Sequence, residues 1–128
     1  MLKVAGLRLG NFINHNGEPM PVVQIERRYK TIFRLNDLDV DERIIEDHFQ
    51  PIPLTPEWLE RCGFEFRKQD EDYIYWGIEN FTIIYGGITG GDHGWFLNGY
   101  HNDCHIQYLH QLQNLYHALT GEELIITL

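Results

Sequence analysis

Histidine and acidic residues cluster between residues 93 and 105 of this 128-residue chain. If residues 101–105 form an extended strand, His101, Asp103 and His105 project from one face, because side chains alternate along a strand. Two imidazoles and one carboxylate are ligands that suit zinc or ferrous iron. The spacing is therefore compatible with a metal-dependent hydrolase or oxygenase. Ordinary surface histidines in a polar turn explain the same pattern, and no longer motif supports the metal site.

Neither cysteine has the setting of a catalytic nucleophile. Cys104 and His105 are adjacent, and adjacent strand residues point to opposite faces, so this pair could not share a proton. Cys62 falls at the C-terminal end of a predicted helix, where the helix dipole disfavours a thiolate. The glycine-rich segment 86–94 leads into a predicted strand and contains no lysine, unlike a phosphate-binding loop. These features favour a non-enzymatic protein without a cofactor.

Charge is unevenly distributed along the chain. Residues 1–68 hold all ten Lys and Arg residues and eleven acidic residues, whereas residues 69–128 hold eight acidic residues and no Lys or Arg. Phosphate binding requires cationic side chains, so the second half disfavours nucleic acid and anionic membranes as partners. A solubilising acidic surface explains this composition, and the alternative is a surface for a cationic protein partner.

Basic residues concentrate at a predicted hairpin tip. Arg27, Arg28 and Lys30 flank Tyr29, and a basic loop with an aromatic residue can contact nucleic acid or an acidic peptide. A solvated hairpin tip is the commoner outcome. Nucleic-acid binding through this tip is therefore an alternative function.

Short strand-like runs at close spacing dominate the first half of the chain. Strands are predicted at residues 7–13, 22–25 and 31–35 and near Val40. A single helical turn is predicted at residues 44–48, just before the last extended stretch of this half. This order suggests an SH3-like β-barrel over residues 1–54.

A capped helix follows the first half. Thr55 suits the N-cap, Pro56 the first helical position and Gly63 the left-handed residue after the helix end, which predicts a helix over residues 56–62. The run of β-branched and aromatic residues at 73–87 predicts two strands with a reversal at Glu79-Asn80.

The remaining segments complete a second β-rich half over residues 55–128. Further strands are predicted at residues 64–66, 95–97, 103–108 and 124–128. A helix is predicted at residues 109–119, where Leu112, Leu115 and Leu119 recur on one face. The second half is therefore a mostly antiparallel sheet packed by a C-terminal helix. The chain as a whole is predicted to be α+β, with both halves packed as one unit.

The other face of the predicted C-terminal helix is uncharged. His110, Gln113, Asn114 and His117 lie opposite the leucines, and solvent exposure is the simplest interpretation. An uncharged polar face of this kind could also contact a protein partner or form a homodimer.

The sequence indicates a reduced, cytoplasmic setting. The N-terminal residues lack the apolar core of a signal peptide, and no apolar run approaches the roughly 18 residues of a membrane span. The two cysteines have no short-spaced partner, as expected of a cytoplasmic protein.

Two segments carry a family resemblance. Residues 49–64 (FQPIPLTPEWLERCGF) and 108–124 (YLHQLQNLYHALTGEEL) are similar to segments of small, uncharacterised proteins of gut bacteria, often encoded in prophages or mobile elements. The resemblance covers most of the chain. It implies a phage-associated accessory role and brings no catalytic residues. We therefore expect a non-enzymatic protein-interaction module.

Overall fold

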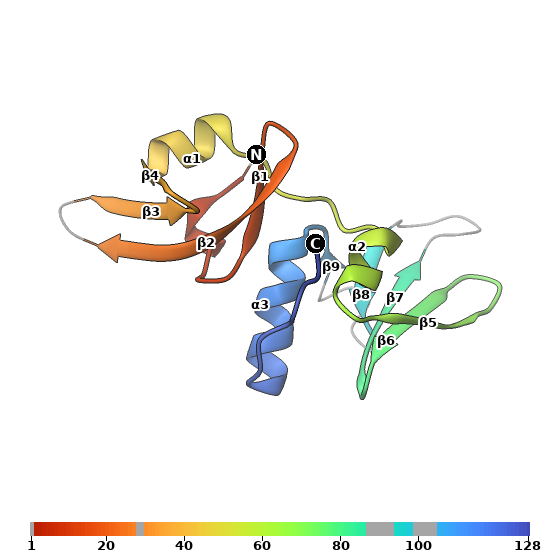
Figure 1. Cartoon of the computed structure of the whole chain (residues 1–128). Coiled ribbons are helices and arrows are strands. Elements are labelled where there is room, and N and C mark those ends of the chain that lie inside the picture. The colour runs from red at the N-terminus through yellow and green to blue at the C-terminus, as the bar shows by residue number, and fades with distance from the viewer. Residues whose placement is uncertain (1, 28–29, 87–93, 99–104) are drawn as a thin grey trace. The chain divides into compact units, whose positions relative to one another are not determined.

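The computed structural model describes residues 2–27, 30–86, 94–98 and 105–128. The chain has an α+β fold with two antiparallel sheets and a C-terminal helix (Figure 1). It divides into two compact units, described separately below: Met1–Pro53 with Tyr108–Asn114, and Leu54–Gln107 with Leu115–Leu128. The sequence-based division at residues 54 and 55 did not assign Tyr108–Asn114 to the first unit. Among the described residues, no helix is long and apolar enough to cross a membrane.

The sheet of the first unit is a meander with the strand order β1-β2-β3-β4. Its strands are β1 (Phe12–His15), β2 (Glu18–Arg27), β3 (Thr31–Leu35) and β4 (Leu38–Asp41). The 3-10 helix η1 (Val4–Gly6) precedes the sheet, and helix α1 (Glu42–His48) follows it and contacts β3 and β4. The strands predicted at residues 22–25, 31–35 and near Val40 are confirmed, as is the helical turn. The described strands form an open sheet and no closed barrel, because β1 and β4 are its two edges.

Tight turns set the register of this sheet. Asn16 and Gly17 have φ values of 53° and 82°, the left-handed conformation that two-residue hairpin loops favour. The strand predicted at residues 7–13 is wrong before Phe12. The chain turns at Gly10, which has a φ of 87°, and the Asn11 side chain accepts a hydrogen bond from the Arg8 amide.

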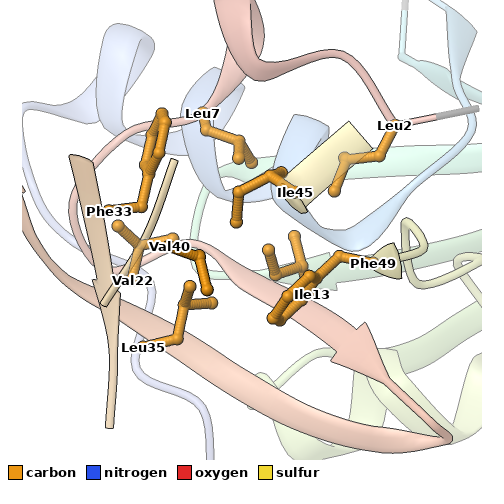
Figure 2. Packing of buried hydrophobic residues seen from close by; sticks show 9 residues of the cluster. All are labelled: Leu2, Leu7, Ile13, Val22, Phe33, Leu35, Val40, Ile45 and Phe49. Atoms are coloured by element: carbon orange, nitrogen blue, oxygen red, sulfur yellow. The ribbon is translucent and has the colours of Figure 1, made fainter. Parts of the chain in front are cut away.

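Nine buried apolar side chains form the core of the first unit and point toward one another (Figure 2). They come from the N-terminal segment, all four strands, α1 and the residue after it. Ile45 of α1 is fully buried in this cluster, and the Asp41 side chain caps the helix by accepting a hydrogen bond from the Ile44 amide. The core residues are Leu2, Leu7, Ile13, Val22, Phe33, Leu35, Val40, Ile45 and Phe49.

Helix α2 (Pro56–Arg61) begins the second unit and confirms the predicted capped helix. The Thr55 hydroxyl accepts a hydrogen bond from the Trp58 amide at 3.3 Å, and Gly63 adopts a φ of 86° after the last turn. These caps orient Leu59, which is fully buried.

The sheet of the second unit has five antiparallel strands in sequence order. They are β5 (Glu65–Gln69), β6 (Ile74–Ile78), β7 (Phe81–Gly86), β8 (Gly94–Leu97) and β9 (His105–Ile106). Ile78 pairs directly with Phe81, which confirms the predicted reversal at Glu79-Asn80. Strand β7 begins directly after this reversal, with Phe81 and Thr82 as its first two residues.

The long side chain of Arg67 crosses over Gly77 in this sheet. A methyl group added at Gly77 of β6 would lie 2.9 Å from the Arg67 guanidinium, which extends from β5. The same guanidinium donates a hydrogen bond to the Glu79 carbonyl oxygen at 2.9 Å. The glycine thus lets Arg67 cross the strand and hold the turn between β6 and β7.

Helix α3 (Leu109–Thr120) confirms the helix predicted at residues 109–119. Gly121, with a φ of 76°, ends it. The strand predicted at residues 124–128 is wrong, because these residues join neither sheet. The Thr127 amide instead donates a hydrogen bond to the Arg61 carbonyl oxygen at 2.8 Å.

The first core supplies a matched test. Leu35 and Leu38 pair across the β3–β4 hairpin, but Leu35 is fully buried whereas Leu38 is 42% exposed. We expect Leu35→Ala to lower the free energy of unfolding by about 2–5 kcal/mol, because it leaves a cavity. Leu38→Ala should cost less than about 1 kcal/mol. Urea denaturation measures both, and equal losses would contradict the assignment of this core.

Candidate partner-binding groove

The structure describes one member of the predicted metal site. His105 is an exposed residue of β9, and its imidazole stacks on the Phe96 ring with 4.9 Å between ring centroids. His101 and Asp103 lie outside the described residues, as do Cys104 and residues 87–93 of the glycine-rich segment. Within the described ranges, no three His, Cys, Asp or Glu side chains gather as a metal set. The proposed ligand trio stays a prediction.

Cys62 is an inert core residue. It is 2% exposed, and burial raises the pKa of its thiol to about 12. The thiol therefore stays protonated at neutral pH and is a poor nucleophile.

Two cations near the predicted basic tip, Lys30 and Arg34, have acidic partners. Arg28 lies outside the described residues, and Arg27 is exposed. The Lys30 ammonium lies 3.6 Å from an Asp41 carboxylate oxygen. The Arg34 guanidinium donates two hydrogen bonds to Asp39, at 2.9 and 3.3 Å, and holds the pKa of that carboxyl below its usual value. These carboxylates reduce the positive potential that phosphate binding would need.

The prediction that one polar face of α3 is exposed is wrong at His110 and Gln113, which are 6% and 2% exposed. At Gln113 the reason is a set of hydrogen bonds inside the first unit. The Gln113 side chain accepts one from the Phe12 amide at 2.9 Å and donates one to the Gly10 carbonyl oxygen at 2.8 Å. Gln113 is therefore a structural residue.

The next residue, Asn114, also forms side-chain hydrogen bonds to the N-terminal segment. Its side-chain oxygen accepts hydrogen bonds from Asn11 at 2.9 Å and from the Arg8 guanidinium at 3.1 Å. Its side-chain nitrogen donates to the Gly6 carbonyl oxygen at 2.7 Å. Among the four predicted face residues, His117 keeps substantial exposure, at 43% of its side chain, and lies 3.7 Å from Glu123.

His110 is enclosed in the first unit as a neutral ring. It stacks nearly parallel on Tyr108, with 5.9 Å between centroids. Its Nδ1 atom is buried and has no hydrogen-bond partner among the described residues. Burial lowers the pKa of this imidazole, because the interior disfavours its charged form.

An open groove of about 440 Å³ lies wholly within the second unit. It is formed where three elements end or begin: the β6–β7 turn, the end of β8 and the last turn of α3. Its volume falls in the range of about 300–1,000 Å³ typical of ligand sites. The lining residues are Ile78, Glu79, Asn80, Phe81, Thr82, Leu97, Asn98, Tyr116, Leu119 and Thr120.

The groove has an apolar floor and an exposed apolar edge. Phe81 and Tyr116 are 8% and 6% exposed, and their rings meet edge to face at 5.2 Å. Leu119, which the helical periodicity predicts in the core, is 58% exposed. An aliphatic side chain beside a buried aromatic pair gives a partner an apolar surface to cover.

Polar groups surround this apolar surface. Glu79, Asn80 and Asn98 are exposed at the groove. Glu79 adopts a φ of 51°, a left-handed conformation that glutamate rarely adopts, and the Arg67 hydrogen bond to its carbonyl holds the turn. Backbone strain of this kind is often found at functional sites.

The electrostatic setting of the groove is negative. Burial raises the pKa of the Tyr116 hydroxyl first, and the charges of Glu79 and Glu122 raise it further. The C-terminal end of α3 adds the negative end of a helix dipole. Arg67 is the cation that the structure places at the turn.

Comparisons with known proteins assign the chain to no family. No protein-family model matches the chain, and neither the curated proteins nor the solved structures contain a match.

The buried imidazole predicts a pH effect on stability. Above the ordinary pKa of 6.5 both the folded and the unfolded state hold His110 neutral. As the pH falls below that value, the unfolded state binds the proton first, so the free energy of unfolding decreases. We expect His110→Phe, which keeps an aromatic ring against Tyr108, to lose less stability between pH 7 and pH 5. His117→Phe is the control, and an equal pH profile for His110→Phe and wild type would contradict the burial argument.

The Gln113 amide gives a second prediction. Gln113→Met keeps the length of the side chain but leaves the Phe12 amide and the Gly10 carbonyl without their partner. We expect a loss of about 1–3 kcal/mol for each orphaned group, measured by chemical denaturation. Gln69→Met on exposed β5 should stay within about 0.5 kcal/mol of wild type. A loss no larger than that of the control would show that the amide is dispensable.

Proposed function

We propose that this protein is a non-enzymatic protein-interaction module that binds its partner through the groove of the second unit. The observation that carries the proposal is the 58% exposure of Leu119 beside the buried Phe81–Tyr116 pair. Solvent contact at this apolar surface is unfavourable, and a partner side chain would remove it. The exposed polar side chains at the edge offer hydrogen bonds that would orient the partner.

We also propose that the first unit has an SH3-like arrangement. After α1 the chain returns to β1, where Asn14 and Gln50 exchange backbone hydrogen bonds at 2.8 and 2.9 Å. Strand β2 pairs with β1 through its first part and with β3 through its second, with a register shift between Val22 and Gln24. A meander whose last segment returns to its first strand is consistent with this family of small barrels.

The biological setting remains part of the proposal. The likeness of residues 49–64 and 108–124 to proteins of gut bacteria and their prophages supports an accessory or host-interaction role. A reduced cytoplasmic setting is consistent with the free, buried thiol of Cys62.

Two other functions have weaker support. A metal-dependent enzyme would rest on a trio of which only His105 is described. Nucleic-acid binding would rest on Arg27, Arg28 and Lys30, and the described ammonium of Lys30 already has an acidic neighbour. A homodimer through the groove is a third arrangement, which the experiments below distinguish.

Selection from a random peptide display library tests the proposed function. We expect the protein to enrich peptides whose affinity falls about tenfold or more in Leu119→Asp, because the new carboxylate would have to be desolvated beneath the peptide. Ile125→Asp is the matched control, because Ile125 is an aliphatic residue of the same unit that is 81% exposed and does not line the groove. No enrichment, or equal binding by both variants, would exclude the groove as the binding site.

A further inference from the structure

The groove presents an apolar surface to a partner side chain. Its floor is the Phe81–Tyr116 pair, and Leu119 stands at its edge. The groove is open rather than enclosed, so a side chain can enter while the backbone that carries it stays at the surface.

The charges around this apolar part have one dominant sign. Glu79 lines the groove, and both Glu79 and Glu122 are close enough to Tyr116 to act on its hydroxyl. The last turn of α3 directs its carbonyl groups toward the same end of the helix, which favours a cation there. No Lys or Arg follows Lys68 in the sequence, so any cationic neighbour of the chain's own comes from an earlier segment.

Arg67 is a cation from such an earlier segment, but it binds the backbone of the turn and not the Glu79 carboxylate. Its guanidinium donates to the backbone carbonyl of Glu79 and lies over Gly77. It therefore supports the turn and leaves the Glu79 carboxylate exposed at the groove. Arg67 therefore offsets the negative potential of the groove only in part.

We propose that the groove selects protein segments in which a large apolar side chain stands next to lysine or arginine. The apolar side chain covers Phe81, Tyr116 and Leu119, and the adjacent cation lies near Glu79, Glu122 and the helix end. This inference rests on the proposed function and names the chemistry of the partner. Charge complementarity then decides which apolar segments bind, as is usual at protein interfaces.

An array of seven-residue peptides tests this selectivity. Each peptide has a central Leu, Ile, Phe or Trp flanked by two lysines, two serines or two glutamates, with serine elsewhere. We expect the lysine-flanked peptides to bind roughly two- to tenfold more tightly than the serine-flanked ones, because each exposed ion pair contributes modestly. The glutamate-flanked peptides should bind most weakly, and added salt should reduce the differences.

Two charge variants separate selectivity from folding. Glu79→Asn and Glu122→Gln should both lower the ratio of the affinity for lysine-flanked peptides to the affinity for serine-flanked peptides. Because asparagine tolerates the left-handed backbone of residue 79, Glu79→Asn should also raise the denaturation midpoint. A weaker preference in a more stable variant cannot come from unfolding.

The outcomes distinguish the inference from the proposed function. Equal binding of all three peptide classes, lost in Leu119→Asp, would overturn the charge selectivity and keep the groove as a binding site. Failure of every peptide to bind, or binding that Leu119→Asp leaves intact, would overturn both. Wild-type protein that sediments as a dimer, with Leu119→Asp as a monomer, would show that a second copy fills the groove and would also overturn the inference.

Discussion

The first unit depends on two amide side chains that hold an irregular segment of backbone. The chain between η1 and β1 is neither helix nor strand, so its polar groups need partners other than a regular ladder. Gln113 and Asn114 supply them, through hydrogen bonds to Gly10 and to Gly6 and Phe12, the residues that flank this segment. These partners lie 101–108 residues apart in sequence. The first fifty residues therefore cannot complete their own hydrogen bonding, and the first unit requires the start of α3.

This long-range dependence explains which elements the sequence could predict. Local signals sufficed for α2, where Thr55 and Gly63 mark the two ends, and for the reversal between β6 and β7. They failed at residues 7–11, where alternating apolar residues favour a strand but Gly10 turns the chain. They failed again at residues 124–128, because strand propensity does not tell whether a sheet edge is within reach.

The same limit applies to the candidate sites. Helical periodicity separates apolar from polar faces, but it cannot recognise a buried amide such as Gln113 whose partners are distant backbone groups. It also places Leu119 in the core, although the helix ends one residue later and leaves that side chain exposed. The groove was not predictable because it combines a turn, a strand end and a helix end. The acidic composition of residues 69–128 was the one available signal, and it left a cationic partner only as the alternative to a solubilising acidic surface.

The two units differ in whether the chain itself pairs or encloses the groups that a partner could contact. Near the first sheet, Arg34 and Lys30 are offset by Asp39 and Asp41 of β4, so these charges offer a partner little. Within the described part of the chain His110 has no hydrogen-bond partner at Nδ1, but the ring is enclosed, so its protonation affects folding rather than binding. In the second unit, Glu79 and Leu119 are exposed at an open groove. A buried unsatisfied group costs stability whatever partner is present, whereas the cost at an open groove is one that binding can remove. We therefore propose the groove, rather than the paired charges beside the first sheet, as the place where a partner binds.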